Sequence, residues 1–148
     1  QVLVALSLGV YTIPSAIASA PRVPAETPAL LLTATQDCID PAAKNALPVF
    51  MSLLSTCKGV VSLVGGSHCQ YADANLGCTI TEDLCGARPN ISRVEQMETA
   101  AKLFGPWLNY TFSRPPERAV ALKNFLAVLQ VLLHSHKVEL LAFDWSGC

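Results

Sequence analysis

Two residues that could carry acid–base chemistry, Asp37 and His68, each follow a short apolar run and a turn. Asp37 comes after Ala29–Thr33 and His68 comes after Val60–Val64, so 31 positions separate the pair (68 minus 37). The residues that leave the carboxyl ends of neighbouring parallel strands share one edge of a sheet, where ligands bind. A carboxylate beside an imidazole fixes the tautomer of the ring and stabilises the imidazolium ion, while the second ring nitrogen faces a nucleophile. The spacing therefore predicts an acid–histidine pair that moves protons.

The elements that must position this pair form a strand–helix–strand unit. Continuous apolar runs bounded by turn residues are typical of strands buried on both faces of a parallel sheet. Between the two runs, Asp40 is expected to cap the amino end of a helix and Pro41 to occupy its first position. Pro48 then either kinks this helix or lies at the start of its main body. A right-handed crossover between parallel strands follows, and Val2–Leu8 is a candidate for a third strand.

The rest of the chain favours helices. Ser92 and Glu95 have the spacing of a capping box, which predicts a helix from about Arg93 to Phe104. Glu117–His134 has apolar residues at helical spacing and is expected to pack on one face. Lys137–Phe143 is a candidate for a last short strand. We expect an α/β domain over residues 1–112 and a C-terminal helical extension over residues 113–148.

The sequence around the pair resembles that of the α/β-hydrolase superfamily, in particular secreted cutinase-like and polyester hydrolases. The resemblance covers Pro28 to Leu108 and depends on Asp37 followed by Pro41, then Ala46-Leu47-Pro48-Val49-Phe50, then Gly65-Gly66-Ser67-His68. It implies the C-terminal portion of the α/β-hydrolase fold, with Asp37 as the triad acid and His68 as the general base. Acid before histidine, each on a strand-end loop, is the chain order of that fold. The implied substrate is a small or polymeric carboxylic ester, and no cofactor is implied.

The same resemblance implies a nucleophile elbow, Gly-x-Ser-x-Gly, upstream of the acid, and the chain has no such motif. Ser7 in Ala5-Leu6-Ser7-Leu8-Gly9 is a near miss, but only 29 residues lie between it and Asp37. We therefore expect a fragment of a hydrolase that is inactive alone and has a missing N-terminal half of the domain as its partner. A dienelactone-hydrolase-like enzyme with a cysteine nucleophile would use the same acid and histidine. The alternative is a non-catalytic, disulfide-stabilised secreted domain derived from a hydrolase.

The six cysteines favour an oxidising compartment, and we expect a secreted protein. A bridge between Cys38 and Cys69 would tie the acid loop to the histidine loop, and it is the pairing we favour. Cys78 and Cys85 would then bridge each other, while Cys57 pairs with Cys148 or each finds a partner in the missing half. Six cysteines allow 15 arrangements, so spacing leaves the connectivity open. Two glycosylation sequons, at Asn90 and Asn109, fit the same compartment.

Composition excludes other classes of protein. The net charge is −1, with 10 basic and 11 acidic residues, so no basic surface indicates a nucleic-acid partner. The apolar runs are shorter than a membrane span requires, and no span is expected.

His134 and His136 end the last predicted helix, where cations are favourable, and we interpret them as structural or solvated rather than as metal ligands. Trp107 is expected in the core, whereas Tyr71 fits either the core or an ester pocket.

Overall fold

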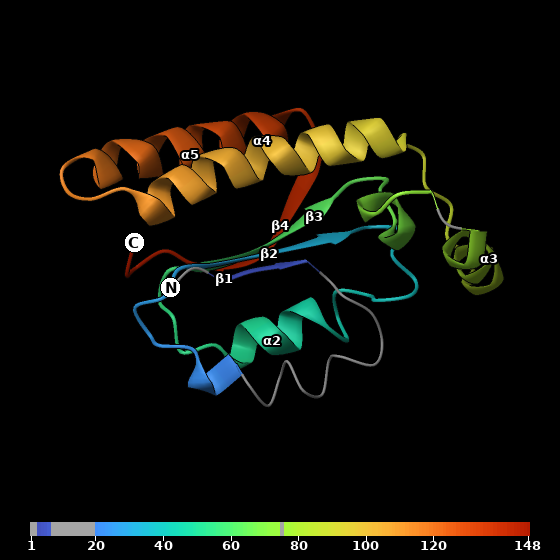
Figure 1. Ribbon diagram of the computed structural model, residues 1–148, viewed down its shortest axis with the longest axis horizontal. Helices are drawn as coiled ribbons and strands as arrows, with labels where there is room; N and C mark the ends of the chain where they lie inside the picture. Colours follow the sequence, from blue (N-terminus) through green and yellow to red (C-terminus); the bar gives the residue numbers. More distant parts are fainter. Residues whose placement is uncertain (1–2, 7–19, 75) are drawn as a thin grey trace.

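The computed structural model describes residues 3–6, 20–74 and 76–148, which form a mixed sheet with helices on both sides (Figure 1). The strands are β1 (Leu3–Leu6), β2 (Ala29–Ala34), β3 (Lys58–Leu63) and β4 (Val138–Asp144), in the order β1-β2-β3-β4. The first three are parallel, and β4 runs antiparallel to β3. The predicted α/β class and the parallel pairing of β2 with β3 are confirmed.

The helices lie in layers on the two faces of this sheet. One face is covered by α2 (Ala46–Ser52) and the other by α4 (Arg93–Phe112) and α5 (Glu117–His134), while α3 (Leu76–Cys85) lies beyond one end of the sheet (Figure 1). Two short 3-10 helices, η1 (Ala20–Arg22) and η2 (His68–Tyr71), complete the described elements. Of the helices in the described ranges, none is long and apolar enough to cross a membrane.

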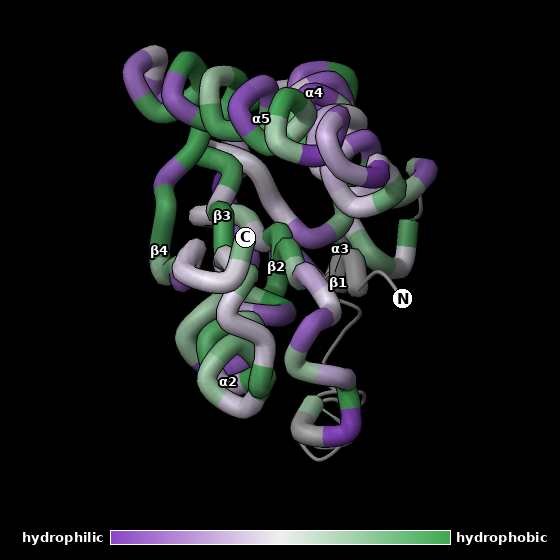
Figure 2. Tube along the Cα trace, turned by 90° about the vertical axis from the view of Figure 1, so that its left-hand side faces the viewer, coloured by the Kyte–Doolittle hydropathy of each residue, from purple (hydrophilic) through white to green (hydrophobic). Residues whose placement is uncertain are grey.

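Alternating side chains of β2 fill two separate cores, which explains its continuous apolar sequence. Leu30 and Leu32 belong to the core beneath α4 and α5, whereas Ala29 and Leu31 belong to the core against α2. All four residues are buried, and complete burial of a leucine contributes about 1.5 to 3 kcal/mol. Figure 2 shows the hydrophobic colouring concentrated along the strands, with mixed colours over α4 and α5. The sheet is therefore the middle layer of three.

The helix between β2 and β3 begins later than the sequence predicted. Helix α2 starts at Ala46, with Asn45 at the N-cap position, so the prediction that Asp40 caps it and Pro41 opens it is wrong. Turns occupy residues 42–45 instead, with Asn45 N donating to the carbonyl of Pro41. Pro48 consequently lies in the first turn of α2, where its missing N–H leaves no hydrogen bond unmade. The second of the two alternatives for Pro48 is confirmed.

Helix α4 continues eight residues past the predicted end at Phe104, through Pro106 to Phe112. A proline inside a helix costs about 3 kcal/mol. The continuation carries Trp107 and Tyr110, both fully buried in the core beneath α4 and α5. Burial of two large aromatic side chains outweighs the cost of the proline, so tertiary packing extends the helix past its predicted end.

Residues 113–148, which the sequence sets apart as a helical extension, contribute α5 and β4 to the same core. Helix α5 has the predicted bounds, and its buried Phe125 and Leu129 join the cluster beneath α4. Strand β4 confirms the candidate last strand, displaced by one residue at each end. A disulfide between Cys57 and Cys148 joins the start of β3 to the end of the chain, which confirms one of the two alternatives for these cysteines.

Candidate functional site

The loops that carry Asp37 and His68 leave the carboxyl ends of adjacent parallel strands and are bonded to each other. Strand β2 ends at Ala34 and β3 at Leu63. Gln36 N donates to the carbonyl of Gly66 at 2.9 Å, and Gly65 N donates to Oγ1 of Thr35 at 2.8 Å. Gly65 has φ +76°, a left-handed conformation that favours glycine. The two hydrogen bonds fix the position of one loop relative to the other.

The structure brings Asp37 and His68 together. Oδ2 of Asp37 lies 3.1 Å from Nδ1 of His68, and the carboxylate side chain is fully buried, while the imidazole side chain is 18% exposed. The hydrogen bond to Asp37 raises the pKa of His68 above 6.5; burial opposes this, and the negative charges of Asp37, Asp40 and Glu82 add to it. Among the described residues, the hydrogen bond of the His68 ring is the one between Nδ1 and Asp37.

Asp40 supports Asp37 rather than helix α2. The backbone N–H of Asp40 donates to Oδ1 of Asp37 at 2.6 Å, and the residue is 1% exposed. The second carboxylate oxygen of Asp37 is therefore held while the first faces His68. A carboxylate fixed at both oxygens can hold the imidazole in one orientation.

The disulfides around the pair differ from the favoured arrangement. Cys38 pairs with Cys85 and Cys69 pairs with Cys78, so the predicted Cys38–Cys69 and Cys78–Cys85 bridges are wrong. The segment between Cys78 and Cys85 belongs to helix α3. A disulfide joins each loop to this helix, and no disulfide joins the two loops directly; the Cα–Cα distances are 5.9 Å and 5.7 Å. Helix α3 therefore ties the acid loop to the histidine loop indirectly.

Sequence reasoning missed two polar residues that contact the histidine turn. Glu82 of α3 is 7% exposed and accepts a hydrogen bond from Cys69 N at 2.7 Å. Gln96 of α4 is fully buried and bonds both backbone groups of Ser67. The positions of these residues in the sequence were the clue to their role: Glu82 lies between two cysteines, and Gln96 lies on the apolar face of a helix.

The two aromatic residues weighed for an ester pocket have structural roles. Trp107 is fully buried in the core, as predicted. The hydroxyl of Tyr71 donates to the carbonyl of Thr33 at 2.8 Å, and the residue packs against the same core. Burial, with a smaller effect of the Asp37 charge, raises the pKa of Tyr71 far above 10. Tyr71 therefore connects the turn after His68 to strand β2.

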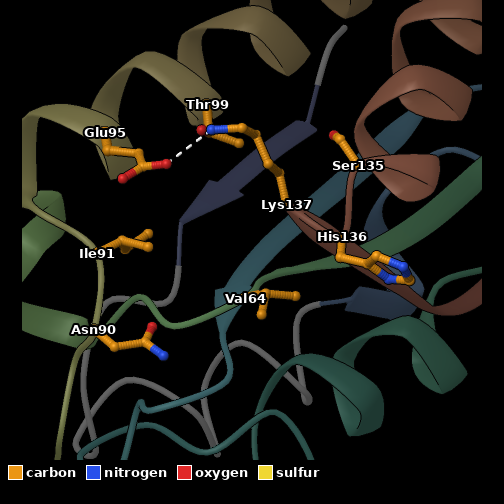
Figure 3. Close-up of a pocket in the computed structure, with 8 residues that line it drawn as sticks. All are labelled: Val64, Asn90, Ile91, Glu95, Thr99, Ser135, His136 and Lys137. Atoms are coloured by element: carbon orange, nitrogen blue, oxygen red, sulfur yellow. Dashed lines mark hydrogen bonds and ion pairs between the residues drawn. The ribbon is translucent and has the colours of Figure 1, made fainter.

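A polar cavity of about 300 Å³ lies between β3, α4 and the α5–β4 turn, and its lining includes neither Asp37 nor His68. Figure 3 shows Lys137 extending from that turn toward Glu95, whose carboxylate lies 2.7 Å from the ammonium group. His136 also lines the cavity and is exposed, and the exposed His134 bonds its own helix through the carbonyl of Gln130. No group of three or more potential metal ligands occurs among the described residues. The full lining is Val64, Asn90, Ile91, Glu95, Thr99, Ser135, His136 and Lys137.

The candidates for a nucleophile in this chain are limited. Ser7, the serine of the near-miss elbow, lies outside the described residues. All six cysteines are in disulfides, so none of them has a free thiol.

No family model, no curated protein and no solved structure matches the chain. A proposal of catalytic roles for Asp37 and His68 therefore rests on the geometry of the pair.

Proposed function

We propose that Asp37 and His68 are the acid and the general base of a secreted carboxylic-ester hydrolase of the α/β-hydrolase type. The observation that carries the proposal is the 3.1 Å contact between Oδ2 of Asp37 and Nδ1 of His68. The pair lies at the carboxyl edge of two adjacent parallel strands, in the chain order acid then histidine. The layers support the same proposal, because parallel strands with helices on both faces are the framework of that fold.

In the proposed reaction His68 transfers protons, and Asp37 holds the imidazole ring of His68 in the required orientation. Nε2 removes the proton of a hydroxyl nucleophile as the nucleophile's oxygen attacks the ester carbonyl carbon. The proton then passes from Nε2 to the leaving alcohol, and an acyl-enzyme remains. Water repeats the sequence, releasing the acid and restoring the nucleophile. Throughout, the buried Asp37 carboxylate stabilises the imidazolium ion without taking a proton from it.

We propose that the nucleophile and the oxyanion-hole donors lie in sequence that precedes Gln1, as the family resemblance implies. Because the cysteines of this chain are all bridged, a cysteine nucleophile would also have to come from that sequence. Three disulfides and the lack of a membrane-spanning helix among the described residues are compatible with secretion. Small and polymeric esters are both candidate substrates.

The test is hydrolysis of p-nitrophenyl butyrate by the protein expressed with its native preceding sequence. We expect His68→Ala and Asp37→Asn each to lower kcat by at least about a thousandfold, because either change disables proton transfer. His134→Ala is the matched control, since this histidine is exposed and its ring bonds the carbonyl of Gln130 in its own helix. The 148 residues alone should show no turnover. Full activity in the folded His68→Ala variant would refute the proposal.

A second candidate function, a non-catalytic secreted domain, is favoured by the three disulfides, which stabilise a core whether or not the protein catalyses a reaction. The two candidates differ in what they require of Asp37 and His68. A preceding sequence with neither a serine nor a cysteine elbow, together with unchanged stability of Asp37→Asn, would favour the non-catalytic domain.

A further inference from the structure

The turn that carries His68 is held at three consecutive residues by three different elements. Gln96 of α4 bonds the backbone of Ser67, Asp37 of the acid loop bonds the ring of His68, and Glu82 of α3 bonds the backbone of Cys69. Only the middle contact involves the side chain of the histidine. The outer two fix the backbone from which that side chain extends.

Gln96 makes two hydrogen bonds to the backbone of this turn. Its Oε1 accepts from Ser67 N at 2.9 Å, and its Nε2 donates to the carbonyl of Ser67 at 2.8 Å. Both Gln96 and Ser67 are fully buried, so no water can replace these bonds without a rearrangement of the turn. A single side-chain amide therefore satisfies both backbone groups of the residue before His68.

The neighbouring glycine leaves space for this contact. A Cβ built at Gly66 would collide with Oε1 of Gln96. Gly66 is itself buried, and its φ lies outside the left-handed region, so space rather than backbone conformation explains glycine at this position. The close approach of the Gln96 amide to the backbone of the histidine turn thus requires two residue types, glutamine at position 96 and glycine at position 66.

We propose that Gln96 is a positioning residue of the acid–histidine pair: its amide fixes the Ser67 peptide groups so that Nδ1 of His68 stays against Oδ2 of Asp37. This proposal rests on the proposed function, because positioning matters to catalysis only if the pair transfers protons. A glutamine is suited to the task, since one planar amide offers both a donor and an acceptor. Glutamate would lack the donor, and methionine, of similar length, would lack both groups.

The test is NMR of the His68 imidazole in the full 148-residue chain. In the wild-type chain we expect a slowly exchanging Nδ1 proton and a titration midpoint above 6.5. In Gln96→Met we expect the Nδ1 proton signal to be lost and the midpoint to move down, toward the behaviour of Asp37→Asn. Gln130→Met is the matched control: the same substitution on an exposed face of α5, which should leave the His68 signals unchanged.

A second variant keeps the test decisive if Gln96→Met does not fold. Gly66→Ala keeps the amide but pushes it away, and we expect the same loss of the Nδ1 signal in that variant. A folded Gln96→Met or Gly66→Ala chain in which the Nδ1 proton and the midpoint match the wild type would overturn the proposal. That result would leave the proposed hydrolase function standing. Conversely, the expected NMR changes without ester turnover in the longer protein would retain the positioning role and refute the hydrolase.

Discussion

The three disulfides close loops of very different length, and this difference predicts unequal contributions to stability. The Cys57–Cys148 bridge spans a sequence separation of 91, whereas the Cys69–Cys78 bridge spans 9. The perturbation is replacement of each pair by alanines in separate variants. The two pairs are well matched, because Cys57 and Cys69 are each 4% exposed and their partners are half-buried. Losses from side-chain packing should therefore be similar in the two variants.

The magnitude follows from the entropy of the unfolded chain, which a longer closed loop restricts more. With loop lengths of 91 and 9, the chain-entropy relation gives about 4.6 and about 2.6 kcal/mol at 25 °C. The difference of about 2 kcal/mol depends only on the ratio of the two lengths, so it does not depend on the constant in the relation. We expect the free energy of unfolding to fall by that much more when the long bridge is removed.

The assay is urea unfolding under non-reducing conditions, followed by far-UV circular dichroism and analysed by linear extrapolation. The m-value should also rise, and rise more for the long-loop variant, because removing a long cross-link exposes more surface in the unfolded chain. Equal losses for the two variants, or a larger loss for the Cys69–Cys78 pair, would refute the loop-length reasoning. Native-state contacts around the short bridge would then dominate its contribution.

Three further predictions concern single residues. Asp37→Asn should lower the pKa of His68, which the contact with Asp37 raises above 6.5. A raised folded-state pKa stabilises the folded protein at low pH, and this contribution is lost as the pH rises through that pKa. The stability deficit of the variant should therefore be larger below pH 6.5 than at alkaline pH, and a pH-independent deficit in urea unfolding would contradict this. Trp107→Ala should cost about 3 to 5 kcal/mol, since the side chain is fully buried, and a drop in Tm of only a degree or two in calorimetry would argue against its central place in the core. Gly65→Ala should cost about 1 to 3 kcal/mol in chemical denaturation, because φ is +76° and the new Cβ would meet Asn90; a neutral result would mean that the turn relaxes freely.

Regular elements with a strong periodic pattern could be predicted from the sequence. Helix α5 has the predicted bounds, and the apolar runs that predicted β2 and β3 do form buried parallel strands. The juxtaposition of Asp37 and His68 followed from those strands, because neighbouring parallel strands bring their carboxyl ends to one edge. Pattern was sufficient where burial on one helix face, or on both faces of a strand, determines the structure.

Features that depend on tertiary contacts could not be predicted. The predicted Cys38–Cys69 and Cys78–Cys85 pairs were wrong because the two loop cysteines pair with cysteines of α3, and nothing in the spacing showed this helix against the two loops. Asp40 had the residue type of an N-cap, yet its N–H binds the carboxylate of Asp37. Gln96 lies on the apolar face of its helix, but only the structure shows that its amide bonds the backbone of Ser67.

The two bridges to α3 also close a covalent ring. The path runs from Cys38 along the chain to Cys69, across to Cys78, along the helix to Cys85 and back to Cys38. One cut of the backbone between Cys38 and Cys69, by a protease for example, would leave the two halves joined through the helix. Asp37 and His68 would remain on one connected molecule. A protein built in this way can be nicked in the α2 crossover and still keep its acid and its histidine together.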